Sequence, residues 1–225
     1  MTISITSLSK YSWFKIETGS MFIHIDPGYA GYFRTQRIPE SELKDKADLV
    51  LVTHFHKDHL QAEALSKIRG PDTIILAPKR CAERIEGSYK IVKPGDKIKI
   101  GDINIRVIDA YNTLEGNSTR KLHHKRDGVG YLLEIEGKTV YHAGDTDFIP
   151  EMKHLGLVDV ALLPIGGTFT MDITEALEAA LTINSRIVIP MHISKADPAE
   201  FKKKLKSKSD IHALTLKIGE IYNLK

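Results

Sequence analysis

The sequence predicts an α+β fold in which two β-sheets pack as a sandwich, each covered by helices on its outer face. Three observations support this prediction. Apolar segments of the kind found in strands occur throughout both halves of the chain. Helical segments with clear start and stop signals are inserted between these strands. Linkers, low-complexity tracts and repeats are not recognisable, so we predict one domain over residues 1–225.

The first half of the chain contains five short apolar segments that predict strands: Ile3–Ile5, Trp13–Ile16, Met21–Ile25, Leu49–Val52 and Thr73–Leu76. Asp26-Pro27-Gly28 interrupts this pattern with residues typical of turns. A helix is expected from about Leu60 to Ile68, because Gly70-Pro71 would stop it, and another over Lys79–Ile85.

The second half continues with strands and two capped helices. The predicted strands are Ile98–Ile100, Ile103–Ile108, Val129–Ile135, Thr139–His142, Val158–Leu163, Ile187–Ile189, Ala213–Lys217 and Ile221–Leu224. Asp172 is the expected N-cap of one helix, with Glu175 as its partner in a capping box. Asp197 is the expected N-cap of the other, which would present Phe201 and Leu205 to the core.

The composition is that of an ordinary soluble globular protein. Apolar residues make up 42% of the chain and charged residues 27%, which excludes disorder as the main state. The net charge of +3 is too small to indicate a nucleic-acid partner. The single cysteine, Cys81, excludes an internal disulfide and a multi-cysteine zinc site. Residues 1–10 lack the apolar stretch of a signal peptide, and apolar runs are too short to span a membrane, so we expect a cytoplasmic protein.

The segment Thr53–His59 carries the strongest chemical signal and directly follows the fourth predicted strand. At the period of a strand, His54 and His56 point the same way, while Asp58 and His59 lie at the turn that opens the next helix. Three imidazoles and a carboxylate suit zinc, and also iron, nickel or manganese. The alternative is a surface loop that is rich in histidine by chance, but this clustering favours a metal site.

Two further candidate ligands also follow predicted strands. Asp145 comes after Thr139–His142, where Gly144 permits close backbone approach, and its two oxygens could bridge two metal ions. His192 follows Ile187–Ile189. Each has an ordinary structural explanation when taken alone, as an N-capping aspartate or a core histidine. Together they favour one site, because functional residues gather on the loops at strand ends.

These motifs, in this order, resemble those of the metallo-β-lactamase superfamily. Smaller details resemble one branch of it, the small single-domain hydrolases related to L-ascorbate-6-phosphate lactonase: Ile25–Gly28, Tyr141–Thr146, Leu163–Gly167 with Thr170-Met171, and Ile189–His192. The resemblance covers nearly the whole chain. It implies a four-layer αβ/βα sandwich with a metal site at one edge of the two sheets.

The resemblance also implies a role for each candidate ligand. The first metal ion would be held by His54 and His56, the second by Asp58, His59 and His192, with Asp145 bridging the two. We expect two divalent ions, zinc first, with manganese, iron or nickel as alternatives.

The third ligand of the first ion is left open. The family places a histidine after the strand that precedes the Asp145 motif, and Asn112 stands there in this chain. His123 or His124 in the following loop could supply the imidazole, with His123 ranked first. Asn112 could instead ligate through its carbonyl or orient substrate, so Asn112 and His123 are also the candidate substrate-binding residues.

Divalent metals lower the pKa of bound water, so the resemblance predicts a metal-activated hydroxide that attacks a small, anionic ester, lactone or phosphoester. In this scheme Asp58 is a catalytic residue that orients the nucleophile or passes its proton to the leaving group. His142 is the second candidate catalytic residue, because it could donate to a substrate oxygen. Its alternative is a buried, hydrogen-bonded strand histidine.

The polar stretch from Asn112 to Asp127 is long for a plain connection. Its four cations are Arg120, Lys121, Lys125 and Arg126. It is either a functional lid that attracts an anionic substrate or a mobile, solvated surface loop. The lysines of Phe201–Lys206 likewise form a solvated helix face or an RNA contact, and the solvated face is favoured.

Two other functions are carried as alternatives. One is a nuclease, since the superfamily includes such enzymes, although this chain is short for the inserted domain or arm that they often have. The other is a non-catalytic metal-binding protein, which the replacement of the third histidine by Asn112 keeps open. We expect a small-molecule substrate and neither a membrane nor nucleic acid as partner, and self-association into a homo-oligomer is compatible with the sequence.

Overall fold

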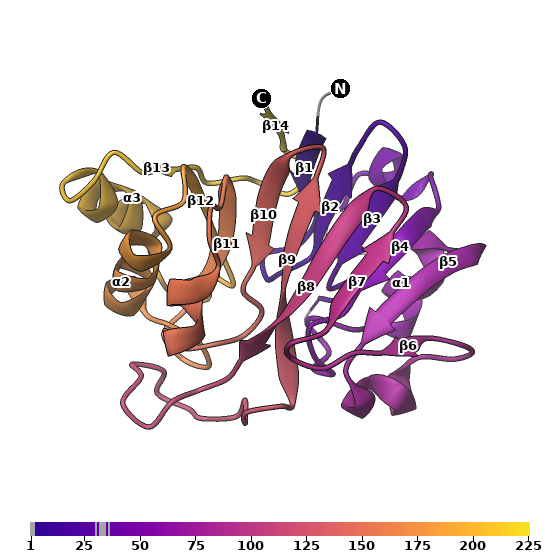
Figure 1. The fold of residues 1–225 in the computed structure, drawn as a ribbon, viewed down its shortest axis with the longest axis horizontal. Helices are drawn as coiled ribbons and strands as arrows, with labels where there is room; N and C mark the ends of the chain where they lie inside the picture. The colour runs from indigo at the N-terminus through magenta and orange to yellow at the C-terminus, as the bar shows by residue number, and fades with distance from the viewer. Residues whose placement is uncertain (1–2, 30, 32–34, 36) are drawn as a thin grey trace. The chain divides into compact units, whose positions relative to one another are not determined.

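The computed structural model describes residues 3–29, 31, 35 and 37–225. Met1 and Thr2, which belong to the segment tested for a signal peptide, lie outside the described residues. The chain forms two compact units, the first made of Met1–Val92 with Leu216–Lys225 and the second of Lys93–Thr215. Each unit contains one seven-stranded mixed sheet (Figure 1). The single domain over 1–225 stays a prediction.

The sheet of the first unit begins with antiparallel strands and continues with parallel ones. Its strands are β1 (Ile3–Ser7), β2 (Phe14–Glu17), β3 (Phe22–Ile25), β4 (Ala47–Leu51), β5 (Arg69–Ala77), β6 (Lys90–Ile91) and β14 (Ile221–Leu224). Their order is β14-β1-β2-β3-β4-β5-β6. Pairing is antiparallel from β14 to β3 and parallel from β3 to β6. The strands predicted in this part of the chain are confirmed.

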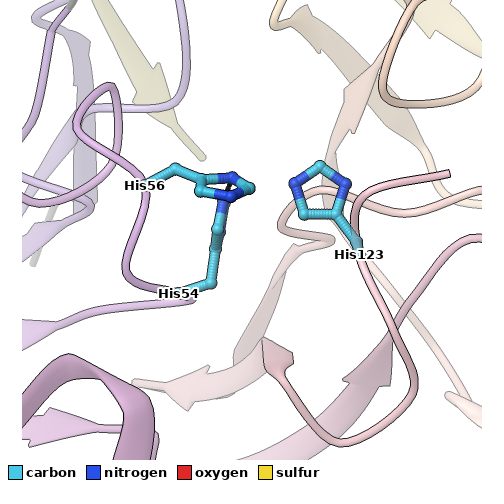
Figure 2. A group of neighbouring side chains, drawn as sticks. All are labelled: His54, His56 and His123. Atoms are coloured by element: carbon cyan, nitrogen blue, oxygen red, sulfur yellow. Dashed lines mark hydrogen bonds between the residues drawn. The ribbon is translucent and has the colours of Figure 1, made fainter. Parts of the chain in front are cut away.

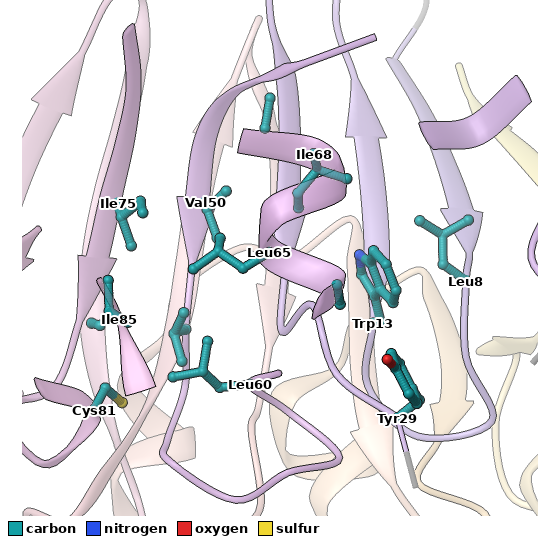
Figure 3. Close-up of a cluster of buried hydrophobic side chains, with 14 residues drawn as sticks. Leu8, Trp13, Tyr29, Val50, Leu60, Leu65, Ile68, Ile75, Cys81 and Ile85 are labelled. Carbon is teal, nitrogen blue, oxygen red and sulfur yellow. The ribbon is translucent and has the colours of Figure 1, made fainter. Parts of the chain in front are cut away.

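The helix α1 (Ala62–Ile68) covers part of this sheet. Its Leu65 and Ile68 lie in one buried cluster with Val50 of β4 and Ile75 of β5, and Trp13 adjoins them (Figure 3). Among its described residues the unit also has two short 3₁₀ helices, η2 (Glu40–Leu43) and η3 (Lys79–Arg84). The helix predicted over Lys79–Ile85 is therefore a 3₁₀ helix.

The helix end predicted at Ile68, before Gly70-Pro71, is confirmed. The helix ends at Ile68, and Gly70-Pro71 lies inside β5. The register between β4 and β5 shifts after the Ala47–Arg69 pair, and proline is tolerated in such an irregular stretch because it has no N–H to donate.

The sheet of the second unit has the same sequence of pairings. Its strands are β7 (Lys97–Ile100), β8 (Ile103–Ala110), β9 (Gly128–Ile135), β10 (Lys138–His142), β11 (Val160–Pro164), β12 (Ile187–Met191) and β13 (His212–Ala213), in the order β13-β12-β11-β10-β9-β8-β7. Pairing is antiparallel from β7 to β10 and parallel from β10 to β13. The strand predicted over Ala213–Lys217 is reduced to β13, whose pairing with β12 covers His212 and Ala213.

The helices of the second unit are α2 (Ile173–Ile183), α3 (Pro198–Lys206) and the 3₁₀ helix η4 (Pro150–His154). α2 contacts β11 and α3, and α3 contacts β13 (Figure 1). Asp172 and Asp197 are N-caps as predicted. Glu175 does not complete the capping box, because its carboxylate accepts from the N–H groups of Asn117 and Phe148.

On α3, Phe201 and Leu205 are buried and the lysines are exposed, as predicted for a helix with one apolar face. Among the described residues, the structure has no helix that is both long and apolar enough to cross a membrane.

Candidate metal centre

Four of the predicted ligands lie together in the first unit, on the segment that follows β4. The Nε2 atom of His54 is 3.0 Å from the Nδ1 atom of His56, with the two rings edge to face (Figure 2). The rings of His54 and His59 are 3.9 Å apart between centroids, and Asp58 Oδ2 is 3.8 Å from His59 Nε2. Two ring nitrogens at 3.0 Å share either a proton or a cation, so this pair is suited to bind one metal ion.

A buried carboxylate behind this cluster orients His59. Asp26 follows β3, which lies parallel to and beside β4, so both polar segments leave the sheet at the same edge. Its Oδ2 atom is 2.7 Å from His59 Nδ1 and 2.7 Å from Thr53 Oγ1, and its Oδ1 atom accepts from the Thr53 N–H. A carboxylate on Nδ1 holds the proton there and leaves Nε2 as the ligand atom, as is usual around metal-binding histidines.

Close packing fixes the same segment from the other side. A Cβ atom on Gly28 would lie 2.5 Å from the backbone of His59, so only glycine fits there. The Ser12 hydroxyl is 3.0 Å from His59 Nδ1. Burial, and then the charge of Asp58, raises the pKa of the neighbouring Tyr11, which therefore stays protonated. The turn Asp26-Pro27-Gly28 is thus part of the support for the ligands.

The second unit gathers its candidate ligands around Asp145. The Nε2 atoms of His123 and His192 each lie 3.3 Å from Asp145 Oδ2, and all three side chains are buried. His123 comes from the β8–β9 loop, which Figure 2 also draws, Asp145 follows β10, and His192 follows β12. Parallel strands bring two of these segments to one sheet edge.

Backbone conformation and backbone hydrogen bonds hold the loops that carry these ligands. His192 has a positive φ of 47°, and a Cβ atom on Gly166 would lie 2.4 Å from the His192 carbonyl oxygen. The Ile165 N–H donates to the Met191 carbonyl, and the Met171 N–H donates to that of Thr146. The Leu163–Gly167 and Thr170-Met171 details of the sequence therefore connect the segments after β10, β11 and β12.

The structure separates the three alternatives for the missing histidine. His123 lies beside Asp145, whereas His124 is exposed. The Asn112 side chain is already engaged: its Oδ1 atom accepts from the His123 N–H at 2.9 Å, and its Nδ2 atom donates to Asp147 and to the Phe169 carbonyl. The substrate-binding roles of Asn112 and His123 stay predictions.

Part of the stretch from Asn112 to Asp127 is tethered by hydrogen bonds. Backbone N–H groups of Thr119 and Arg120 donate to carbonyls of the β11–α2 loop, and the Asn117 N–H donates to Glu175. These bonds hold part of the stretch against its neighbours, and its role as a functional lid or a mobile, solvated surface loop stays a prediction.

Two of the four loop cations are paired within the unit. Lys121 Nζ is 3.0 Å from Asp147 Oδ2, and Lys125 Nζ is 2.8 Å from Glu151 Oε1. The hydrogen bond to Glu151 raises the pKa of Lys125. Arg120 lies over the Phe169 ring, at 5.8 Å from its centroid, and Arg126 is exposed. Arg120 and Arg126 therefore remain the loop cations that could attract an anionic substrate.

His142 is fully buried on β10, and its Nδ1 atom accepts from the Gly144 N–H at 3.2 Å. This environment matches the alternative to a catalytic role, that of a buried, hydrogen-bonded strand histidine. Because Nδ1 accepts, the proton of the neutral ring lies on Nε2, which is therefore the nitrogen able to donate. Its catalytic role stays a prediction.

Asp26 and Asp147 are not among the functional residues predicted from the sequence. Both are fully buried, and both hold residues of the candidate ligand segments. Each follows a predicted strand within a few residues. A carboxylate in that position is a usable signal, because a buried charge is rarely without a partner.

The donor set fits divalent metal ions in chemical type. Both units offer imidazoles and carboxylates that are buried or half-buried: His54, His56, Asp58 and His59 in the first and His123, Asp145 and His192 in the second. His59 and His123 have Nδ1 beside an acceptor, which leaves Nε2 to ligate. Neutral Nε2 atoms and carboxylate oxygens all present lone pairs. Lone pairs held close together repel one another, so a bound cation would stabilise this arrangement.

Comparison with known proteins identifies the class. Residues 4–192 match the model of the β-lactamase superfamily domain. The metallo hydrolase Igni18 from the archaeon Ignicoccus hospitalis aligns with a TM-score of 0.82 and 29% identity, covering 100% of this chain and 99% of its own. The metallo-β-lactamase fold protein YhfI from Bacillus subtilis aligns with a TM-score of 0.77 and 13% identity, covering 99% of each chain, which shows the fold alone. The chain has the metallo-β-lactamase fold.

Relatives narrow the class to a family. The chain is 35% identical over 214 residues to a UPF0173 metal-dependent hydrolase of Pyrococcus abyssi, covering 90% of this chain and 92% of the relative. It is 34% identical over 234 residues to one of Pyrococcus furiosus, covering 99% and 100%. The chain belongs to the UPF0173 family of metal-dependent hydrolases within the metallo-β-lactamase superfamily.

Proposed function

We propose that this metal-dependent hydrolase cleaves a small, anionic ester, lactone or phosphoester, with two divalent metal ions held by the candidate ligands. The main supporting observation is that each unit has a buried histidine whose Nδ1 atom lies beside a hydrogen-bond acceptor. These acceptors are the Asp26 carboxylate for His59 and the Phe169 carbonyl for His123. Such support directs Nε2 toward a metal ion. Family membership adds that the relatives are metal-dependent hydrolases.

The proposed ligand assignment extends the one implied by the family resemblance. His123 is added as the third histidine of the first ion, because it lies beside Asp145 while His124 is exposed. The first ion would be held by His54, His56 and His123, the second by Asp58, His59 and His192, and both by Asp145. Zinc is the first candidate, since histidine and aspartate without cysteine suit it, with manganese, iron or nickel as alternatives.

Divalent ions bound there would lower the pKa of water and polarise a carbonyl or phosphoryl oxygen of the substrate. The chain's own residues would handle the proton. The Asp58 carboxylate lies 3.8 Å from His59 Nε2 and its side chain is 25% exposed, so it could accept a proton from water and deliver it to the leaving group. The Nε2–H of His142 would donate to a substrate oxygen.

The anionic character of the substrate is supported by two loop cations, Arg120, which lies over the Phe169 ring, and the exposed Arg126. The resemblance to L-ascorbate-6-phosphate lactonase makes phosphorylated lactones the first compounds to test. A small molecule is the proposed partner, and a chain whose one cysteine, Cys81, is buried and free suits the cytoplasm as location.

The test combines metal content with a substrate screen. Elemental mass spectrometry would be applied to the purified chain, to His56→Ala and to His154→Ala as a matched control, because His154 is exposed on η4. Lactones, p-nitrophenyl esters, phosphomonoesters and bis-p-nitrophenyl phosphate would then be tested with each. We expect two metal equivalents per chain in the wild type and the control, a clear loss in His56→Ala, and turnover of a small ester, lactone or phosphoester.

Other outcomes would replace the proposal. Metal uptake without turnover of any compound would favour a non-catalytic metal-binding protein. Cleavage of the phosphodiester together with salt-sensitive cleavage of RNA would favour a nuclease. Absence of metal after reconstitution with zinc, manganese and iron would overturn the dinuclear centre.

A further inference from the structure

The loop between β8 and β9 is closed at its base by a pair of residues eleven positions apart. The Asn112 N–H donates to the His123 carbonyl at 2.8 Å, and the Asn112 Oδ1 atom accepts from the His123 N–H at 2.9 Å. These two bonds place His123 directly beside the end of β8. The backbone of His123 is thus held at the strand end by the residue that occupies the place of a histidine in the family pattern.

The same asparagine also helps to set the ring of His123. Asn112 Nδ2 donates to the Phe169 carbonyl at 2.9 Å, and His123 Nδ1 lies 3.1 Å from that same oxygen. A carbonyl oxygen only accepts, so the proton of neutral His123 lies on Nδ1. The Nε2 lone pair then faces Asp145, 3.3 Å from Oδ2. One carbonyl oxygen therefore links the position of Asn112 to the tautomer of His123.

Asp147 anchors this arrangement. Its fully buried carboxylate accepts from Asn112 Nδ2 at 3.2 Å, from the Thr113 N–H at 2.9 Å and from Lys121 Nζ at 3.0 Å. The loop backbone packs against it so closely that a Cβ atom on Gly116 would lie 2.1 Å from Asp147 Oδ2. Asp147 therefore binds the loop near both of its ends.

Asp147 also belongs to the turn that carries Asp145. Its N–H donates to the Tyr111 carbonyl at 3.0 Å, and the intervening Thr146 hydroxyl is 3.1 Å from that oxygen. The turn that presents Asp145 and the loop that presents His123 are consequently connected through three successive residues of one segment. Movement of one ligand relative to the other would break these bonds.

We propose that Asn112 and Asp147 are positioning residues that hold His123, in its Nδ1–H tautomer, as the third histidine ligand in place of a histidine at the end of β8. This inference rests on the proposed function, in which His123 binds the first metal ion. The family pattern has a histidine where this chain has Asn112. In the proposal, Asn112 holds His123, which takes the place of that histidine as a ligand.

The test reads the His123 tautomer by ¹⁵N NMR of the full chain before metal addition, and then the affinity of each metal equivalent by zinc titration. The variants are Asn112→Ala, which removes the bonds to Phe169 and to the His123 N–H, and Asp147→Asn, which keeps the shape but removes the charge that faces Lys121. Asn117→Ala is the control, because Asn117 lies in the same loop and its amide donates to Asp172, at the α2 end. Circular dichroism would show which variants are folded.

We expect His123 to be a single Nδ1–H tautomer in the wild type and in Asn117→Ala, and a mixture in Asn112→Ala and Asp147→Asn. One zinc equivalent should bind about 10–100-fold more weakly in these two variants, while the other is unchanged. If Asp147→Asn does not fold, Asn112→Ala alone decides, since its side chain is only half-buried. An unchanged tautomer in a folded Asn112→Ala variant overturns the proposal. If His123 becomes a mixture of tautomers but both zinc affinities are unchanged, the ligand role of His123 is overturned instead, and with it the premise of this proposal.

Discussion

The two units use one sheet topology to build two different ligand clusters. In each sheet, one strand joins the antiparallel part to the parallel part, β3 in the first unit and β10 in the second. A buried aspartate follows that strand in both cases, Asp26 and Asp145. Asp26 faces donors, the Thr53 N–H and hydroxyl, and supports His59, whereas Asp145 faces the Nε2 atoms of two histidines. The same topological position therefore serves as support or as ligand according to whether its neighbours carry protons.

The clusters also differ in how far apart their members lie in the chain. The first unit takes its ligands from one segment, His54 to His59, directly after β4. The second collects His123, Asp145 and His192 from three loops. A cluster assembled from distant segments depends on tertiary contacts at every segment, so its geometry should be easier to disturb by changes outside the ligands.

The largest expected effect comes from removing one ligand in each unit. His54→Ala and His192→Ala should each lower kcat/KM by more than about 100-fold, because loss of a mere partner of a metal ligand already costs about 10–100-fold. The assay is hydrolysis of the compound found in the screen, with His154→Ala as control. A large loss in one variant only would show that one of the two clusters is not needed for hydrolysis.

A smaller effect is expected when the support of His59 is weakened. Asp26→Asn keeps the size of the side chain and tolerates the positive φ of 54° at this position, but it removes the charge beside His59 Nδ1. Metal affinity, measured by competition with a chelating dye, should fall about 10–100-fold. Asp48→Asn is the control, because Asp48 is exposed on β4. Equal affinities in the two variants would mean that Asp26 does not act on the metal ligands.

Close packing behind the ligands gives the next effect and compares the units directly. Gly28→Ala places a Cβ atom 2.5 Å from the His59 backbone, and Gly166→Ala places one 2.4 Å from the His192 carbonyl oxygen. Each should destabilise the protein by about 1–3 kcal/mol in urea unfolding, as overpacking does. Gly70→Ala is the matched control, since its Cβ atom meets side chains rather than backbone, Lys46 at 3.2 Å and the Thr73 hydroxyl at 3.6 Å. Wild-type stability in both test variants would show that these contacts relax without cost.

The smallest effect is expected for a substitution on α3, which contributes no candidate ligand to either cluster. Lys204→Ala removes an exposed pair with Glu200, one helical turn away on α3, whose nitrogen and oxygen are 2.6 Å apart. The loss should be about 0.3–0.5 kcal/mol in the same urea assay, with hydrolysis and metal content unchanged. Reduced hydrolysis would draw α3 into the function and reopen the RNA-contact interpretation of its lysines.

Much of the fold and part of the site follow from local sequence patterns. The strands around β3, β4, β10 and β12 and the caps Asp172 and Asp197 were predictable because strand alternation and capping join residues close together in the chain. The segment from His54 to His59 was recognisable for the same reason, since its four ligand types are contiguous. Gly70-Pro71 correctly predicted the helix end at Ile68, but that the two residues lie inside β5, beside the register shift, was not predictable from local preference.

The sequence by itself determined that a histidine-rich metal segment follows a buried strand and that one histidine of the family pattern is replaced by Asn112. Only the tertiary structure decided that Asp26 supports His59, that His123 rather than His124 lies beside Asp145, and that Lys121 is paired with Asp147. The physical reason is separation along the chain. Periodicity and capping act within a few residues, whereas these contacts join residues that meet only when strands pair and loops close over them.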